Sequence, residues 1–225
     1  MMISDKRINI FVGHFGSGKT EISINYALDL QRRGLKTMIV DLDIVNPFFR
    51  TVEVKDYLEQ NEIKVIAPNF AGTALDVPSI PASVYSAFDN ANFNVVLDIG
   101  GDDAGARILG NLRDHISDGT YDMLYVINAR RPLSADISAV GNLLHSIEQT
   151  SGLKVTGLIN NTNLSSETTI YDIMYGQVLA EDLSRQADIP IVKICGMPHV
   201  LEQLPDEYKD KAMPIKIFLH VPWEQ

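Results

Sequence analysis

The sequence predicts an α/β fold: a three-layer sandwich with a mostly parallel central sheet covered by helices on both faces. The main observation is that short apolar segments, typical of buried strands, alternate along the chain with longer segments of helical periodicity. In addition, no internal repeat, low-complexity segment or proline-rich linker divides the chain. The expected strands are 7–12, 36–40, 63–67, 93–97, 121–128, 155–159 and 189–194, and the expected helices are 21–30, 53–60, 82–90, 104–116, one that starts at Ser134, and 168–187.

Bulk composition limits the class of protein. A chain of 225 residues with 45% hydrophobic residues can bury a full core, so residues 1–225 are expected to form a single domain. There is no apolar run of about 18 residues and no apolar leader, and the single Cys195 excludes an internal disulfide. These features predict a cytoplasmic protein without a membrane segment. The formal net charge of −10 argues against a nucleic-acid partner.

The first strand runs into a glycine-rich loop, residues 13–20, which reads Gly-His-Phe-Gly-Ser-Gly-Lys-Thr. Two glycines separated by four residues and followed by Lys19 and Thr20 match the phosphate-binding loop of P-loop NTPases. Glycines allow successive backbone N–H groups to turn toward phosphates, and the following helix adds its positive end. Lys19 is expected to reach the β- and γ-phosphates, and Thr20 to bind Mg²⁺ through its hydroxyl. The expected nucleotide contacts in this segment are Gly13, Gly16, Ser17, Gly18, Lys19, Thr20 and Glu21.

Two acids, Asp41 and Asp43, follow the second strand. Side chains alternate along a strand, so the two carboxylates are expected on one side, at the end of the sheet where ligands bind. The loop after them contains Phe48 and Phe49, which would form either a switch or partner surface or an anchor to the core. Residues 68–81 contain several prolines and read as irregular.

Asp98 closes a strongly apolar strand, which is the Walker-B pattern for a carboxylate in the Mg²⁺ shell. Gly101, three residues later, is expected to offer its N–H to the γ-phosphate. Asp102 and Asp103 are expected to cap the helix that follows, because acids favour a helix N-terminus.

Later strand ends carry further polar residues. Arg130 and Arg131 would face phosphates, face a partner, or simply be solvated. Asn160 and Asn161 suit base recognition, because an amide offers a donor and an acceptor, although an asparagine-rich turn would look the same. Pro198 lies in the loop expected beside the base, and 215–219 reads as an added edge strand.

Taken in order, these motifs resemble those of the MinD/ParA-type ATPases, within the class of CobQ/CobB/MinD/ParA nucleotide-binding domains. The resemblance covers nearly the whole chain and implies the P-loop NTPase fold, with ATP and Mg²⁺ as cofactors. It implies that Thr20, Asp41 and Asp98 hold the metal, that Lys19 and Asp43 are the catalytic residues, and that Asp43 orients the attacking water. Counted from Gly157, Asn161 falls at the adenine-recognising asparagine of the class.

The departures from this class are specific. His14 occupies the place of the signature lysine that reaches across a dimer in these relatives, so Arg50, Arg107 or Arg130 is a candidate replacement cation. A homodimer is one expected assembly, since the class forms nucleotide-sandwich dimers, but His14 removes the residue that would have argued for it. A single cysteine provides no paired-cysteine metal or cluster motif, and 212–225 lacks an amphipathic membrane tail.

The leading interpretation is a Mg²⁺-dependent ATPase that acts as a nucleotide-driven switch on a protein partner. The alternative is an ATP-dependent small-molecule ligase or kinase resembling the synthetase members of the class, with 68–81 lining an acceptor pocket. A third interpretation is a binding module without hydrolysis.

Overall fold

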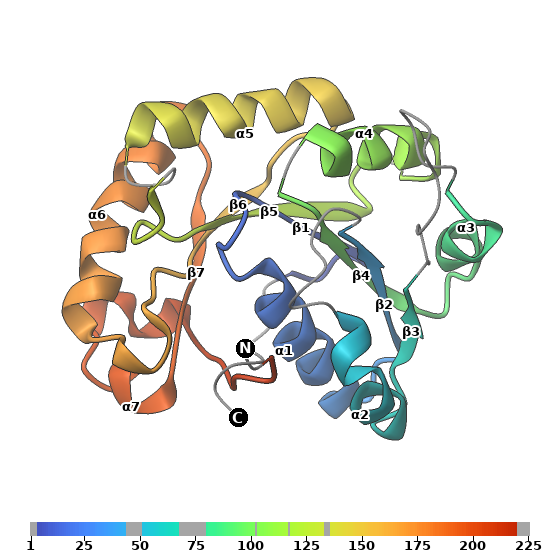
Figure 1. The fold of residues 1–225 in the computed structure, drawn as a ribbon, viewed down its shortest axis with the longest axis horizontal. Helices are drawn as coiled ribbons and strands as arrows, with labels where there is room; N and C mark the ends of the chain where they lie inside the picture. The colour runs from blue at the N-terminus through green and yellow to red at the C-terminus, as the bar shows by residue number, and fades with distance from the viewer. Residues whose placement is uncertain are drawn as a thin grey trace.

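A computed structural model describes residues 4–43, 51–67, 80–101, 103–116, 118–132 and 136–219. One eight-stranded sheet runs through the described chain in the order β3-β2-β4-β1-β5-β6-β7-β8, and every neighbouring pair is parallel (Figure 1). The α/β class with a parallel central sheet is therefore confirmed. The strands are β1 Ile8–Val12, β2 Thr37–Leu42, β3 Lys64–Ile66, β4 Asn94–Ile99, β5 Tyr121–Ile127, β6 Gly157–Asn160, β7 Ile191–Gly196 and β8 Ala212–Pro214.

Helices cover both faces of this sheet (Figure 1). Short 3₁₀ helices accompany the described α-helices at Thr51–Val54, Arg113–His115, Ser165–Glu167 and Asp206–Lys211. The α-helices are α1 Lys19–Arg32, α2 Lys55–Gln60, α3 Ala82–Asp89, α4 Asp103–Leu112, α5 Ile137–Ser151, α6 Ile170–Ala187 and α7 Pro198–Leu201.

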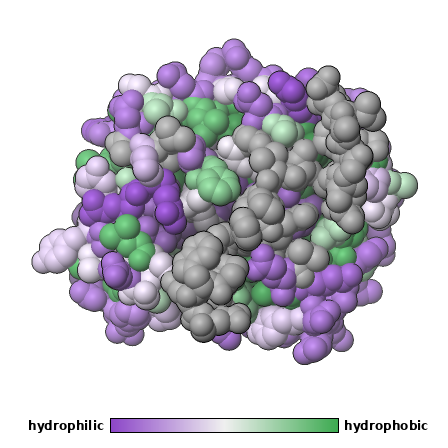
Figure 2. Space-filling model, viewed as in Figure 1, coloured by the Kyte–Doolittle hydropathy of each residue, from purple (hydrophilic) through white to green (hydrophobic). Residues whose placement is uncertain are grey.

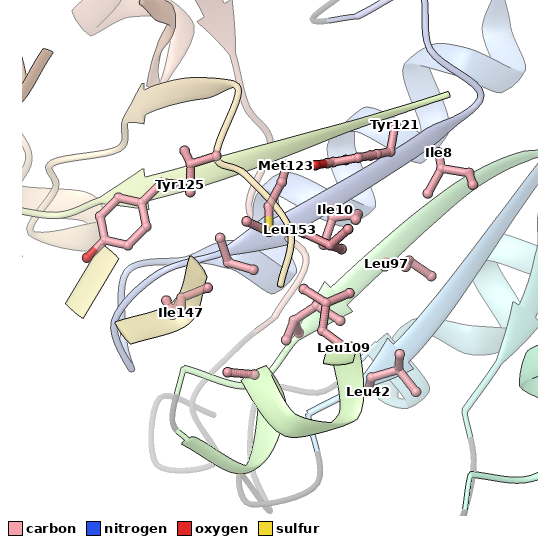
Figure 3. Packing of buried hydrophobic residues seen from close by; sticks show 14 of the residues in the cluster. Ile8, Ile10, Leu42, Leu97, Leu109, Tyr121, Met123, Tyr125, Ile147 and Leu153 are labelled. Atoms are coloured by element: carbon pink, nitrogen blue, oxygen red, sulfur yellow. The ribbon is translucent and has the colours of Figure 1, made fainter. Parts of the chain in front are cut away.

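Alternation of side chains along the strands produces a separate apolar layer on each face. On one face, Ile10 and Leu97 pack with residues of α3, α4, α5 and α6, such as Leu109 and Ile147 (Figure 3). On the other face, Phe11 packs with residues of α1 and α2, and its ring lies 5.7 Å from that of Tyr26 in an edge-on arrangement. Parallel strands buried on both faces explain the continuous apolar runs in the sequence.

The order of the strands reverses at β1. From β1 the chain crosses to β2, which lies beyond β4, and later crosses to β5 on the opposite side of β1. In open α/β sheets, ligands bind at the carboxyl ends of the strands, at such a switch point. The loop that joins β1 to α1 lies at this position.

Some element boundaries differ from the expectation. α5 begins at Ile137 and is capped by Asp136, whose carboxylate accepts from the N–H groups of Ser138 and Ala139; Ser134 lies outside the described residues. The expected edge strand at 215–219 is wrong: the edge strand is β8, which pairs with β7. The segment 215–219 instead hydrogen-bonds to α1, as described below.

Other expectations fall outside the described residues, namely those on Phe48, Phe49, Arg50, Asp102 and most of the 68–81 segment. Asp103 is the first residue of α4. Within the described chain, no helix is both long and apolar enough to span a bilayer. On the face shown in Figure 2, hydrophobic residues of the described chain occur in small separate patches among hydrophilic ones.

Candidate nucleotide-binding site

The loop between β1 and α1, residues 13–18, has the backbone that its glycines were expected to provide. Gly13, Gly16 and Gly18 have φ angles of 139°, 74° and 88°, in the region that favours glycine. At Gly13, a Cβ would also lie 2.4 Å from the carbonyl oxygen of Val126 on β5. The loop is therefore pressed against the sheet and has no room for a side chain there.

Lys19 lies across this loop. Its Nζ donates to the carbonyl oxygen of His14 at 3.1 Å, and the residue is only 6% exposed. Ser17 N also donates to the same His14 oxygen, at 3.1 Å, and this hydrogen bond joins the two sides of the loop. The buried hydroxyl of Ser17 has no hydrogen-bond partner, as is expected of a group that faces a ligand.

Three buried acids, Asp41, Asp43 and Asp98, lie beside the loop. Asp41 and Asp98 are register partners in the parallel pair β2–β4, so their side chains lie next to each other on the same face. Asp43 follows β2, and its N–H donates to Asp41 Oδ1 at 3.1 Å. The structure therefore brings together carboxylates from the ends of two strands, β2 and β4.

Burial raises the pKa of Asp98, and the neighbouring Asp41 carboxylate raises it further. The Thr20 hydroxyl and the Lys19 ammonium act in the opposite direction on this pKa. Neither carboxylate oxygen of Asp98 has a hydrogen-bond partner of good geometry, although both are buried. A buried carboxylate of this kind is costly unless a cation or donor compensates it.

These residues fit a magnesium ion. No group of three or more His, Cys, Asp and Glu side chains is arranged as a metal cage in the described chain. Mg²⁺ at nucleotide sites does not need one, because it is held by one or two carboxylates, a hydroxyl, phosphates and water. The carboxylate oxygens of Asp98, which lack hydrogen-bond partners, lie near the Asp41 carboxylate and the Thr20 hydroxyl. Together these groups are oxygen donors of the kind that Mg²⁺ takes.

Gly101 contacts the loop between β1 and α1, residues 13–18, which is the expected phosphate-binding loop (the phosphate loop). A Cβ on this residue would lie 2.5 Å from Phe15 N and 2.8 Å from Gly13 O, so the two backbones meet without an intervening side chain. Phe15 itself is 59% exposed at this place. A γ-phosphate contact from Gly101 stays a prediction.

The two asparagines after β6 have separate roles. Asn161 Nδ2 donates to Ser17 O at 2.7 Å, while its Oδ1 is buried and has no partner. Asn160 is turned toward α6, where its Nδ2 donates to Ile173 O and to Gln177 Oε1. Of these two residues, Asn161 therefore lies against the phosphate loop, and its expected contact with adenine stays a prediction.

Two further candidates, Glu21 and Pro198, lie at the margin. The carboxylate of Glu21 accepts from the N–H groups of Phe218, at 2.5 Å, and Leu219, at 3.3 Å. Burial raises the pKa of Glu21 to about 7, against the effect of these two hydrogen bonds. Pro198 is exposed at the start of α7. Nucleotide contacts from either residue stay predictions.

Among the arginines, Arg131 rather than Arg130 contacts the phosphate loop. Arg131 Nε donates to Gly16 O at 3.0 Å. Arg130 turns to α6, where it forms an ion pair with Asp172 at 2.7 Å and lies over the ring of Tyr175. Arg107 is exposed on α4. Adjacent arginines at one strand end give no sequence signal that tells them apart.

Residues 10–193 match the sequence profile of the family described as the CobQ/CobB/MinD/ParA nucleotide binding domain. No curated protein matches the chain. Three solved structures illustrate the fold that it shares. They are cell division protein FtsY from Thermotoga maritima (TM-score 0.57, 19% identity), chloroplast FtsY from Physcomitrella patens (0.58, 18%), and the signal recognition particle 54 kDa protein from Aeropyrum pernix in complex with GDP (0.55, 18%).

The alignments cover 94%, 85% and 83% of this chain, and 64%, 58% and 40% of the respective solved chains. The chain thus spans less than two thirds of the length of these structures. At such identities the likeness establishes the fold alone.

Proposed function

The chain belongs to the CobQ/CobB/MinD/ParA nucleotide-binding domain family, and we propose that it is a Mg²⁺-dependent ATPase whose hydrolysis switches its interaction with a protein partner. The observation that carries this proposal is the convergence of Lys19, Asp98 and Asn161 on one loop, from three different elements. Phosphate, metal and base recognition each have a residue there.

Phosphate binding rests on the loop and on Lys19. The loop's backbone and the positive end of α1 attract the phosphate chain, and the Lys19 ammonium neutralises its β- and γ-phosphates. Thr20, Asp41 and Asp98 would hold Mg²⁺, which when bound supplies positive charge against the phosphate oxygens. The Lys19 ammonium has three N–H donors, so it can contact phosphate oxygens while one donor stays on the His14 carbonyl.

Hydrolysis needs a group that positions water. Asp43 is the only one of the three acids that lies beyond its strand, and its own N–H is fixed on Asp41 Oδ1. Its carboxylate would accept a proton from the attacking water and hold that water in line with the γ-phosphate.

Asn161 favours ATP over GTP. Its amide nitrogen faces the Ser17 carbonyl and is therefore occupied as a donor, which leaves Oδ1 as an acceptor without a partner. Adenine presents an amino donor at C6, whereas guanine presents a carbonyl acceptor there. An acceptor in the site pairs with the first and repels the second.

A protein partner is supported by Phe15. An aromatic side chain that is 59% exposed on a phosphate loop is unusual for a surface in contact with water alone, and aromatic residues are enriched at interface cores. A partner seated over Phe15 would contact the loop whose backbone meets Gly101, and so would sense the nucleotide. This partner is a second copy of the chain or another protein.

The test compares nucleotide binding and single-turnover hydrolysis in two variants. Lys19→Ala should lose nucleotide binding, whereas Asp43→Ala should bind ATP and lose hydrolysis. Competition between ATP and GTP for the wild-type site should favour ATP, and Asn161→Ala should reduce that preference. Normal hydrolysis by Asp43→Ala would rule out the role given to Asp43, and tighter binding of GTP would rule out ATP as the substrate.

One observation favours a second candidate, an ATP-dependent ligase or kinase for a small molecule. His14 stands where the dimer-bridging lysine is expected, and synthetase members of the class do not need that lysine. Turnover that appears only with an added metabolite, together with phosphate transfer to it, would favour this candidate. Slow turnover that is raised by a protein would favour the switch.

A further inference from the structure

The side chain of Arg131 contacts the phosphate loop at Gly16. Besides the bond from its Nε to Gly16 O, its Nε, Cδ and Cζ atoms lie 3.4, 3.6 and 3.9 Å from the place where a Cβ of Gly16 would be. The guanidinium end of the side chain therefore lies at van der Waals distance from this part of the loop. Its Nε is one of five N–H donors, so most of its donor capacity is available to an anion or another acceptor.

The position of Arg131 is set by the buried Asn128 at the end of β5. Arg131 N donates to Asn128 O at 3.1 Å, and Asn128 Oδ1 accepts from Arg130 N at 3.0 Å, which forms a tight turn. Asn128 also exchanges hydrogen bonds with the backbone of Asn163. The turn that carries Arg131 is thus joined to the segment that carries Asn161.

The order of the sheet decides which part of a nucleotide Arg131 meets. β4 and β2, which carry Asp98 and Asp41, lie on one side of β1, and β5 and β6 lie on the other. A nucleotide bound to the loop would have its γ-phosphate and metal beside the acids and its base beside Asn161. Arg131 follows β5, which lies between β1 and β6, the strand that precedes Asn161, on the side away from the acids.

We propose that Arg131 is a nucleotide-binding residue that acts within its own chain on the part of the ligand shared by ATP and ADP, between the β-phosphate and the base. The inference rests on the proposed nucleotide-binding function. It gives Arg131 a role different from that of the missing signature lysine, because that lysine reaches the nucleotide of the other subunit of a dimer. The neighbouring Arg130 cannot take this role while Asp172 and the Tyr175 ring hold it on α6.

The test measures equilibrium binding of ATP and of ADP, by calorimetry, to the wild type and to Arg131→Ala, Arg131→Gln and Arg130→Ala. Arg131→Ala should weaken the binding of both nucleotides by about ten-fold, as for loss of one charge-assisted contact, and leave their ratio unchanged. Arg131→Gln keeps a donor for Gly16 O without the charge and should show nearly the same loss. Arg130→Ala, a matched loss of charge one residue away, should bind both nucleotides as the wild type does.

Wild-type affinity of Arg131→Ala for both nucleotides would overturn the inference. So would a loss for ATP alone with a fall in kcat, since that would place Arg131 at the γ-phosphate. Recovery of affinity in Arg131→Gln would also overturn it, because the side chain would then act only by supporting the loop. This binding measurement does not depend on hydrolysis. If the wild type binds ATP and ADP but does not hydrolyse ATP, the role of Arg131 is still tested. If the wild type binds no nucleotide, the proposed function itself is refuted.

Discussion

Asp41 and Asp98 are nearest neighbours across the β2–β4 pair, both are almost fully buried, and the two oxygens of Asp98 lack hydrogen-bond partners. Two adjacent carboxylates in a site of this kind repel each other. Without a cation, the protein therefore keeps an arrangement that costs stability, which is common where residues are selected for binding.

At a pH above the raised pKa of Asp98, Asp98→Asn should stabilise the protein in the absence of nucleotide, by about 1–2 kcal/mol, because it removes a buried charge next to Asp41 while it keeps the shape. It should also abolish the extra stability that Mg²⁺ and ATP confer on the wild type. Denaturant unfolding with and without the ligands measures both effects. Asp5→Asn, at an exposed position, changes net charge equally and should do neither. A less stable Asp98→Asn protein would show that the carboxylate is compensated in the empty site.

Gly101→Ala should destroy nucleotide binding by displacing the phosphate loop, since its Cβ would lie 2.5 Å from Phe15 N, a backbone atom that cannot move alone. We expect a loss of stability of about 1–3 kcal/mol as well. Gly141→Ala is the matched control: it lies within α5, where the nearest atom would be 3.8 Å away, so the change should be neutral or slightly stabilising. Calorimetric nucleotide titration and thermal unfolding separate the two variants, and normal ATP binding by Gly101→Ala would refute the close contact.

The stability of the protein should fall as the pH rises toward neutrality, partly through Glu21. Its pKa is raised from the ordinary 4.5 to about 7, mainly by burial, so the folded state holds this proton more tightly than the unfolded state does. The stabilisation from Glu21 is therefore full below about pH 4.5 and is lost as the pH passes through about 7. Glu21→Gln, which cannot ionise, should flatten this part of the profile when unfolding is measured between pH 5 and 8. An unchanged slope would assign the pH dependence to other groups.

Asn25→Ala should destabilise the contact of the C-terminal segment with α1. The Asn25 side chain donates to Lys216 O and accepts from Lys216 N, both at 2.8 Å, so the truncation leaves two backbone groups without partners. We expect a loss of about 1–3 kcal/mol and faster proteolytic cleavage near residue 216. Gln31→Ala removes an exposed hydrogen bond from the same helix and should leave cleavage unchanged. Equal cleavage rates in the two variants would mean that Asn25 does not hold the segment.

Local patterns predicted most of the sheet, because each central strand is a short apolar run ended by polar residues. The site followed for the same reason: Asp41, Asp98 and Asn161 each come at a strand end, and parallel strands bring their carboxyl ends together. Those predictions needed no knowledge of distant contacts.

The sequence failed where a local pattern was compatible with more than one structure. The apolar run at 215–219 looks like a strand, but Glu21 and Asn25, nearly two hundred residues earlier, bind its backbone instead. Ser134 and Asp136 are both good caps by type, and the structure begins α5 after Asp136. Arg131 differs from Arg130 only in which neighbour its side chain reaches, which the sequence does not encode locally.

The bonds from Glu21 and Asn25 to residues 216–219 have a consequence for biosynthesis. The ribosome makes Glu21 and Asn25 nearly two hundred residues before it makes their partners at 216–219. Until then, the first turns of α1 lack the backbone groups that bind these two side chains. A nascent chain that ends before residue 216 should therefore carry a phosphate loop whose supporting helix lacks these hydrogen bonds, so the nucleotide site would reach its final form only after these residues have been added.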